Sequence, residues 1–66
     1  MISNYLKEYF KERKITHEEI ERKTGIARSK ITLSFNNKRN LTAEELIMIA
    51  IKFNLDLNKI KKLDNN

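Results

Sequence analysis

The 66-residue sequence contains no cysteine, no proline and only one glycine. The lack of cysteine excludes disulfides, Cys-based zinc sites and thiol chemistry. The lack of proline and the single glycine leave little of the turn chemistry that a β-fold needs. No apolar run is long enough to span a bilayer, and the first ten residues lack the apolar core of a secretory signal. We therefore expect one small, cytoplasmic, all-α domain that spans residues 1–66.

The net charge of +5 is concentrated in the middle of the chain. Residues 1–21 carry four basic and five acidic side chains, whereas residues 22–43 carry six basic ones and no acidic one. Residues 44–66 carry four of each sign, so the whole excess lies in the middle third. Such a patch attracts polyanions. A solvated surface would have the same composition, so charge alone does not decide between the two interpretations.

Three N-terminal capping patterns indicate where helices begin. Thr16 with Glu19, and Thr42 with Glu45, have the spacing of a capping box, and Asp56 is a further N-cap residue. Each cap is flanked by an apolar pair that can act as a hydrophobic staple: Ile15–Ile20, Leu41–Leu46 and Leu55–Ile60. These patterns predict helices that begin near residues 16, 42 and 56, after a first helix over residues 2–13 with apolar residues at helical spacing.

The fourth predicted helix, residues 42–54, is apolar almost all round. We therefore expect it to be the central and most buried helix, with Met48 filling a place in the core. The fifth helix is short, and the tail at residues 64–66 is expected to be frayed.

Two short helices, residues 16–23 and 27–36, flank the only glycine. Gly25 can take the left-handed conformation that ends a helix, and Asn36-Asn37 can close the second helix of the pair. The pair, about residues 16–36, is therefore a helix-turn-helix candidate. Its second helix has one buried edge, and its opposite face is short, basic and hydrogen-bonding, as a helix that enters the major groove requires. The edge is Ile31 and Phe35, and the face is Arg28, Ser29, Lys30, Thr32 and Leu33.

From about Leu6 to Ile60, the sequence resembles the phage-repressor and Cro-like (XRE-type) helix-turn-helix domains of bacterial transcription regulators. Four segments carry the resemblance, in the right order and at the right spacing. They are Ile15-Thr16-His17-Glu18-Glu19-Ile20, Thr24-Gly25-Ile26-Ala27-Arg28-Ser29-Lys30-Ile31, Phe35-Asn36-Asn37-Lys38-Arg39-Asn40-Leu41-Thr42 and Ile49-Ala50-Ile51-Lys52-Phe53-Asn54-Leu55. The resemblance implies a compact five-helix bundle of the lambda-repressor-like type whose third helix reads bases in the major groove.

The resemblance also implies two sets of DNA-contacting residues. Candidate base readers lie on the third helix, where an Arg can reach guanine O6 and N7 and a Leu can pack on a thymine methyl. They are Arg28, Ser29, Thr32 and Leu33. Candidate phosphate ligands lie at the start of the second helix, on the third helix and in the loop after it. They are Thr16, His17, Lys30, Asn36, Lys38, Arg39 and Asn40.

Some positions depart from the family pattern. His17 stands where relatives usually carry Gln. Because the imidazole of His17 can titrate, a contact between His17 and a phosphate would depend on pH. Glu21 replaces a small Ala, so the packing there must loosen or the side chain must turn outward. Ala27 cannot cap the third helix as Ser or Thr would. Phe10 and Phe35 occupy positions at which many relatives pair a buried Arg with a Glu, and we predict that the two rings pack together.

We therefore expect a sequence-specific transcriptional regulator, a repressor or Cro-like switch, that is nucleoid-associated and occupies an operator. Its expected partner is double-stranded DNA with a pseudo-palindromic site, which it would bind as a homodimer, and no membrane. Little sequence follows the fifth helix, so either an apolar patch near Leu57 and Leu63 forms the dimer or the chain is part of a longer protein.

An alternative is a protein-interaction module, such as an antitoxin or antirepressor with the same fold. The acid-free stretch at residues 22–43 favours nucleic acid over this alternative. RNA binding is less favoured because the third helix offers no aromatic stacking platform. We expect no enzymatic activity, metal or cofactor, because a lone His17 without a second His or any Cys is typical of a capping or surface residue.

Overall fold

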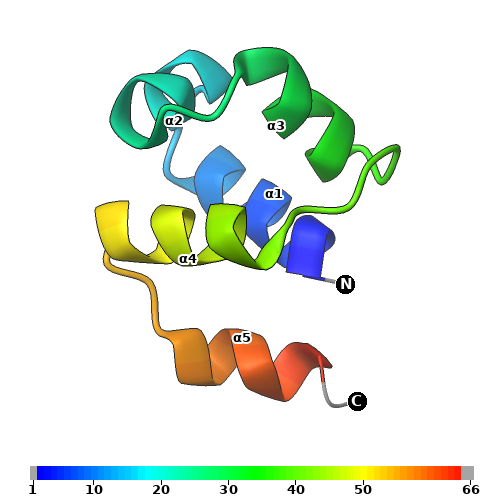
Figure 1. Ribbon diagram of the computed structural model, residues 1–66. Coiled ribbons are helices and arrows are strands. Elements are labelled where there is room, and N and C mark those ends of the chain that lie inside the picture. The colour runs from blue at the N-terminus through cyan, green and yellow to red at the C-terminus, as the bar shows by residue number, and fades with distance from the viewer. Residues whose placement is uncertain (1, 65–66) are drawn as a thin grey trace.

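The computed structural model describes the backbone of residues 2–64 and the side chains of residues 2–60 (Figure 1). The five helices in that range are α1 (Ile2–Glu12), α2 (His17–Thr24), α3 (Arg28–Phe35), α4 (Ala43–Lys52) and α5 (Leu57–Asp64). The predicted all-α, five-helix architecture is confirmed. Of the tail that was expected to be frayed, Asp64 is the last residue of α5, and residues 65–66 lie outside the described range.

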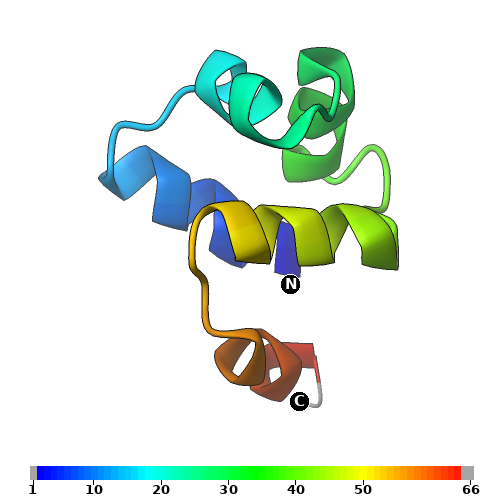
Figure 2. The same ribbon diagram turned by 60° about the vertical axis from the view of Figure 1, so that its left-hand side comes forward.

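The helices α2 and α3 form one end of the molecule, with α1 and α4 across the middle (Figures 1 and 2). α5 lies at the opposite end, beyond α4 as seen from the α2–α3 pair, in both views. α2 packs against α3 and α4, and α1 packs against α3 and α5. The outer side of α3 has no helix over it in the described part of the chain, and its side chains there are exposed.

The core is built from apolar side chains of all five helices and of the turn between α2 and α3. Its buried members are Leu6, Phe10, Ile20, Ile26, Ile31, Phe35, Ile49, Ala50 and Ile60. The rings of Phe10 and Phe35 are stacked, with centroids 6.1 Å apart and planes 10° from parallel. The predicted packing of these two aromatics is therefore confirmed. Phe53 closes the cluster by meeting Phe10 edge to face at 4.8 Å.

The capping residues fix the helix starts as the sequence predicts. Thr42 makes the full capping box: its hydroxyl accepts from the Glu45 N–H at 3.1 Å, and the Glu45 carboxylate accepts from the Thr42 N–H at 2.9 Å. At Thr16 only the first bond forms among the described residues, because the Glu19 carboxylate lies 3.9 Å from the Lys23 ammonium instead. The predicted box at the start of α2 is therefore half correct. At α5, the Asp56 carboxylate accepts from the Asn58 N–H at 2.9 Å.

The expectation that α4 is the most buried helix is wrong. Ile49 and Ala50 are buried, but Ile47 is 47% exposed and Ile51 is 67% exposed. A helix with apolar residues on every side cannot direct all of them to the core when it packs through one side only, because its side chains point in all directions around the axis. Met48 is also exposed, so it is not a core residue.

Candidate nucleic-acid interface

α3 separates a buried side from an exposed side that carries the predicted base readers. Ile31, Ser34 and Phe35 are buried. Ser29 and Leu33, which are four residues apart and therefore lie on one face, are exposed. The flanks of this face are Arg28 and Thr32 on the side of α2, and Lys30 on the side of α4. The structure thus brings the four predicted base readers to one side of α3, where Arg28, Ser29 and Leu33 are exposed and Thr32 is half-buried.

The turn between α2 and α3 sets the position of that side of α3. Gly25 has φ +81°, and its N–H donates to the Glu21 carbonyl at 2.8 Å, which ends α2 as predicted. A Cβ at Gly25 would meet no atom within 4 Å, so the constraint on this position is its backbone conformation alone. The Thr24 hydroxyl donates to the Ile20 carbonyl at 2.7 Å and accepts from the Ile26 N–H at 3.1 Å. These bonds fix the chain where it leaves α2.

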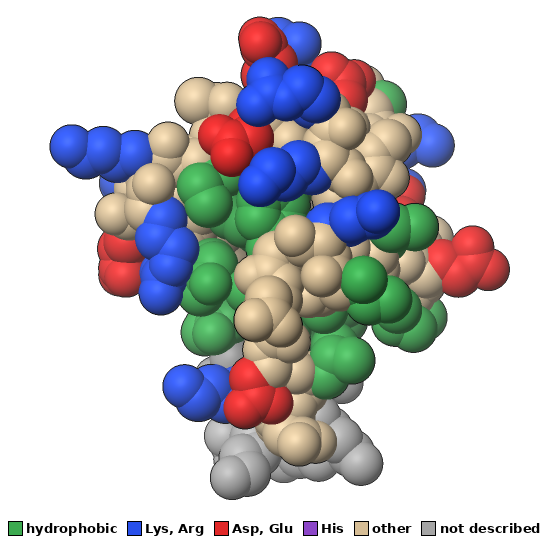
Figure 3. All heavy atoms as spheres, turned by 90° about the vertical axis from the view of Figure 1, so that its left-hand side faces the viewer, with side chains coloured by type: hydrophobic (Ala, Val, Ile, Leu, Met, Phe, Trp, Pro, Cys, Tyr) green, Lys and Arg blue, Asp and Glu red, His purple; other side chains and the backbone are tan. Residues whose placement is uncertain are grey.

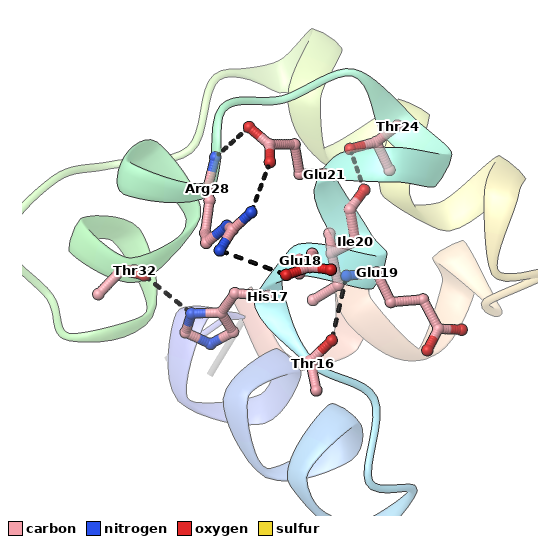
Figure 4. A network of polar contacts seen from close by, with 9 residues as sticks. All are labelled: Thr16, His17, Glu18, Glu19, Ile20, Glu21, Thr24, Arg28 and Thr32. Atoms are coloured by element: carbon pink, nitrogen blue, oxygen red, sulfur yellow. Dashed lines mark hydrogen bonds and ion pairs between the residues drawn. The ribbon is translucent and has the colours of Figure 1, made fainter.

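Glu21 supplies the cap that Ala27 cannot. Its carboxylate accepts from the Arg28 backbone N–H at 3.0 Å and lies 3.4 Å from the Arg28 guanidinium (Figure 4). Glu18, one turn earlier on α2, lies 3.4 Å from the same guanidinium. Of the two outcomes predicted for Glu21, the side chain turns outward, and there it satisfies a free N–H at the start of α3. The sequence signal for this contact was the absence of a capping residue at position 27 together with an acid one turn before the end of α2.

His17 joins the start of α2 to the middle of α3. Its Nδ1 and the Thr32 hydroxyl share a hydrogen bond of 2.8 Å (Figure 4), and its ring meets Phe35 edge to face at 5.3 Å. Burial lowers the pKa of His17, which favours the neutral form of its ring. Thr16, the exposed N-cap residue, directly precedes it. Of the two predicted phosphate ligands at the start of α2, His17 therefore contacts a predicted base reader on α3.

Arg39 connects the loop after α3 to α4. Its guanidinium donates to the Glu45 carboxylate in a bidentate pair of 3.0 and 2.8 Å and to the buried Ser34 hydroxyl at 2.9 Å. The hydrogen bonds from Arg39 hold the pKa of Glu45 below its ordinary value. Sequence reasoning had interpreted Glu45 only as a capping residue and Arg39 only as a phosphate ligand. The two are six positions apart, and this spacing crosses a loop that no periodic pattern describes.

The remaining polar residues of this loop face solvent. Asn37 has φ +62° and its side-chain amide donates to Asn4 of α1 at 3.0 Å, which ties the loop to the N-terminal helix. The Lys38 N–H donates to the Leu33 carbonyl at 2.8 Å, which closes the end of α3. The predicted phosphate ligands that are exposed in this loop are Asn36, Lys38 and Asn40.

A family model described as helix-turn-helix matches residues 6–60. The chain belongs to the helix-turn-helix family. The match is to the XRE type, a non-enzymatic family of DNA-binding domains, so DNA is the partner of this domain. Searches of the curated proteins and of the solved structures give no match.

This helix-turn-helix domain has less unpaired positive charge at its α2–α3 end than the composition suggests. Arg28 and Arg39 are two of the six cations in the acid-free stretch, and both are paired with carboxylates from outside it. Blue and red side chains lie side by side over the upper part of the face in Figure 3. Within residues 2–60, three cations of the stretch have no carboxylate within 4.0 Å: Arg22, Lys30 and Lys38.

Among the described residues, no group of three or more His, Cys, Asp or Glu side chains is arranged to hold a metal ion. No helix within residues 2–64 has the length and apolar character needed to cross a membrane.

Proposed function

We propose that this domain is a sequence-specific transcriptional regulator, a repressor or Cro-like switch, that occupies an operator with α3 in the major groove. The observation that carries the proposal is the exposed strip of α3, with Ser29 and Leu33 at its centre and Arg28 beside them. An exposed Leu in a hydrogen-bonding, basic face contributes no burial energy while it is in water. It can bury its apolar surface by packing against a thymine methyl.

Arg28 is the proposed guanine reader, with Ser29 and Thr32 as further hydrogen-bonding readers. A bidentate contact between Arg and guanine is worth about 1–3 kcal/mol of discrimination. Ion pairs between exposed side chains, such as those of Arg28 with Glu18 and Glu21, contribute only about 0–1 kcal/mol. These weak pairs therefore do not prevent Arg28 from donating to a base edge.

The proposed phosphate ligands lie on both sides of the reading strip. Thr16 and His17 lie at the start of α2, where free backbone N–H groups and the helix dipole favour an anion. On the other side are Lys30, Asn36, Lys38 and Asn40, which are all exposed. We propose that the main role of Arg39 is to brace the loop, which means that it holds the loop against α4 through its hydrogen bonds to Ser34 and Glu45. It can contact a phosphate only through the guanidinium N–H groups that these bonds do not use.

We further propose a homodimer on a pseudo-palindromic operator. The support is the exposed apolar side chains of α4 and the start of α5, which are Ile47, Met48, Ile51 and Leu57. Green side chains reach the surface at the height of α1 and α4 in Figure 3. Leu57 belongs to the patch named from the sequence, whereas the side chain of Leu63 lies outside the described residues. Apolar surface of this kind marks association sites on small proteins.

The same apolar surface also fits the second candidate function, a protein-interaction module of the antitoxin or antirepressor kind. A protein partner on α4 would leave the α3 strip without a role, whereas a DNA-bound homodimer uses both surfaces. The first proposal therefore explains more of the exposed residues.

Selection of duplexes from a random pool tests the proposed function. We expect one enriched motif made of two half-sites about one helical turn apart, because relatives of this fold bind as two-fold dimers. Recovery of the pool without enrichment at any salt concentration would contradict sequence-specific binding. Enrichment of a single half-site would contradict only the homodimer.

A further inference from the structure

Arg28 differs from the other cations of the α2–α3 end in being held by two carboxylates at once. The Glu21 carboxylate lies 3.4 Å from its Nη2, and the Glu18 carboxylate lies 3.4 Å from its Nη1 (Figure 4). Both acids lie on α2, on the side that faces the start of α3. Arg22, Lys30 and Lys38 have no such partner among residues 2–60.

Stability does not explain this arrangement. The Arg28 side chain is 53% exposed and that of Glu18 is 63% exposed, and ion pairs between exposed side chains add little to the stability of a fold. The cap on α3 needs only the Glu21 oxygen that accepts from the Arg28 backbone N–H. The contacts with the guanidinium are therefore additional to the cap. Their physical consequence is to favour one orientation of a long, flexible side chain through two different nitrogens.

We propose that Glu18 and Glu21 are positioning residues that hold Arg28 for base reading and keep it away from phosphates. This inference rests on the proposed function. An unpaired Arg at the edge of the interface would bind any phosphate and would raise affinity for all sequences alike. The two carboxylates offset its charge, which weakens its attraction for phosphates. At most two of the five guanidinium N–H groups face them, so enough donors remain for a bidentate contact with guanine.

A double-mutant cycle on Glu18 and Arg28 tests the proposal. The variants are Glu18→Gln, Arg28→Ala and the two combined. Glu8→Gln is the control, because it makes the same charge change at an exposed position of α1. The probes are the duplex recovered by selection and a scrambled duplex of the same composition. The dissociation constant of each is measured over a salt series.

For Glu18→Gln we expect the preference for the selected duplex over the scrambled one to fall by roughly fivefold, the lower end of what one bidentate base contact supplies. The salt slope for the scrambled duplex should steepen by about one, because the released Arg28 gains a phosphate contact. In the Arg28→Ala background the same substitution should leave the preference unchanged. Glu8→Gln should shift both duplexes by the same factor.

Two results would overturn the inference while leaving the proposed function in place. The first is a Glu18→Gln protein that behaves like Glu8→Gln. The second is a loss of preference that is equally large in the Arg28→Ala background, because Glu18 would then not act through Arg28. A wild-type protein that binds the two duplexes equally would instead overturn the proposed function, and this inference with it.

Glu21 needs a separate variant because it also caps α3. Glu21→Gln keeps an oxygen that can accept from the Arg28 N–H, whereas Glu21→Ala removes it. We expect Glu21→Gln to lower the preference for the selected duplex with little change in the thermal midpoint, and Glu21→Ala to lower both. If Glu21→Gln retains the wild-type preference, Glu21 is a cap only and its part in the proposal is wrong.

Discussion

Arg28 and Arg39 come from the same acid-free stretch of sequence, yet the structure gives them opposite surroundings. The Arg28 side chain is 53% exposed, and its two carboxylate contacts are 3.4 Å long. The Arg39 side chain is 23% exposed and makes three hydrogen bonds of 2.8–3.0 Å. Weak, exposed pairs leave an arginine donors for a further partner, whereas a bidentate pair with a further hydrogen bond fixes both of its ends. The contrast separates an arginine that we propose contacts DNA from one that holds the loop.

The largest expected effect falls on the core that supports both regions. Phe35 stacks on Phe10 and contacts the His17 ring, so Phe35→Ala should lower the free energy of unfolding by about 3–5 kcal/mol. Urea unfolding followed by circular dichroism measures this loss. Leu33→Ala, at an exposed apolar position of the same helix, is the control and should change stability by no more than about 0.5 kcal/mol. Similar losses in the two variants would show that α3 is not anchored as described.

The next effect tests whether Arg39 holds the loop against α4 through Ser34 and Glu45. Arg39→Ala should lower the unfolding midpoint more than Arg28→Ala does, because it leaves Glu45 and the buried Ser34 without their partner. Thermal unfolding of the two variants side by side gives the comparison. An equal loss in both would mean that the two arginines do not differ as their surroundings indicate.

A pH series checks the same pair independently. Arg39 holds the pKa of Glu45 below its ordinary value of 4.5, so the stabilisation is fully present above about pH 4.5. It should be lost as the pH falls through the lower pKa of the folded state. Glu45→Gln should make the unfolding midpoint less dependent on pH below 4.5. A variant with the wild-type pH dependence would exclude Glu45 as its source.

Arg28→Ala should act on DNA rather than on the fold. We expect it to reduce binding to the selected duplex by about 1–3 kcal/mol and to relax the preference at one base position. Binding to a panel of duplexes with single base changes measures both effects. If the variant weakens every sequence by the same factor, Arg28 is not a base reader.

Lys38→Ala should weaken binding without changing the preference. Lys38 is exposed beside the braced loop and has no carboxylate within 4.0 Å among residues 2–60. Removal of one phosphate contact lowers the salt slope by about one. Lys11→Ala, on the exposed side of α1, is the matched control for the loss of one charge. A preference that changes with Lys38 would assign it to base reading instead.

The smallest expected effect concerns His17. Its folded-state pKa is lowered by burial, so below the ordinary pKa of 6.5 the unfolded chain binds more protons than the folded one. Stability should therefore fall as the pH drops from about 6.5 to the folded-state pKa, and level off below it. His17→Gln should flatten this part of the curve. An unchanged curve in the variant would locate the proton uptake elsewhere.

The features that the sequence predicts well are local. Thr16, Thr42 and Asp56 mark helix starts because a cap and its N–H partner lie within three residues of each other. Gly25 marks the turn because its left-handed conformation is a property of one residue. The contact between Phe10 and Phe35 is long-range, and it was predictable only because the family resemblance placed both positions in one pair.

The features that sequence reasoning missed depend on how helices are placed in space. Glu21 reaches Arg28 across a turn, and Arg39 reaches Glu45 across a loop, so no periodicity links the partners. The exposure of Ile51 was missed because an apolar pattern does not say which sides of a helix are covered. The net charge of the acid-free stretch was likewise misleading as a measure of free positive charge. The carboxylates that pair with two of its cations come from α2 and α4.

The most direct test of α3 as the reading element is a map of amide chemical-shift changes during titration with the selected duplex. We expect the largest changes at Arg28, Ser29 and Leu33, with smaller ones in the loop at Lys38. Largest changes at Ile47 and Ile51 of α4, with the amides of α3 unshifted, would contradict it.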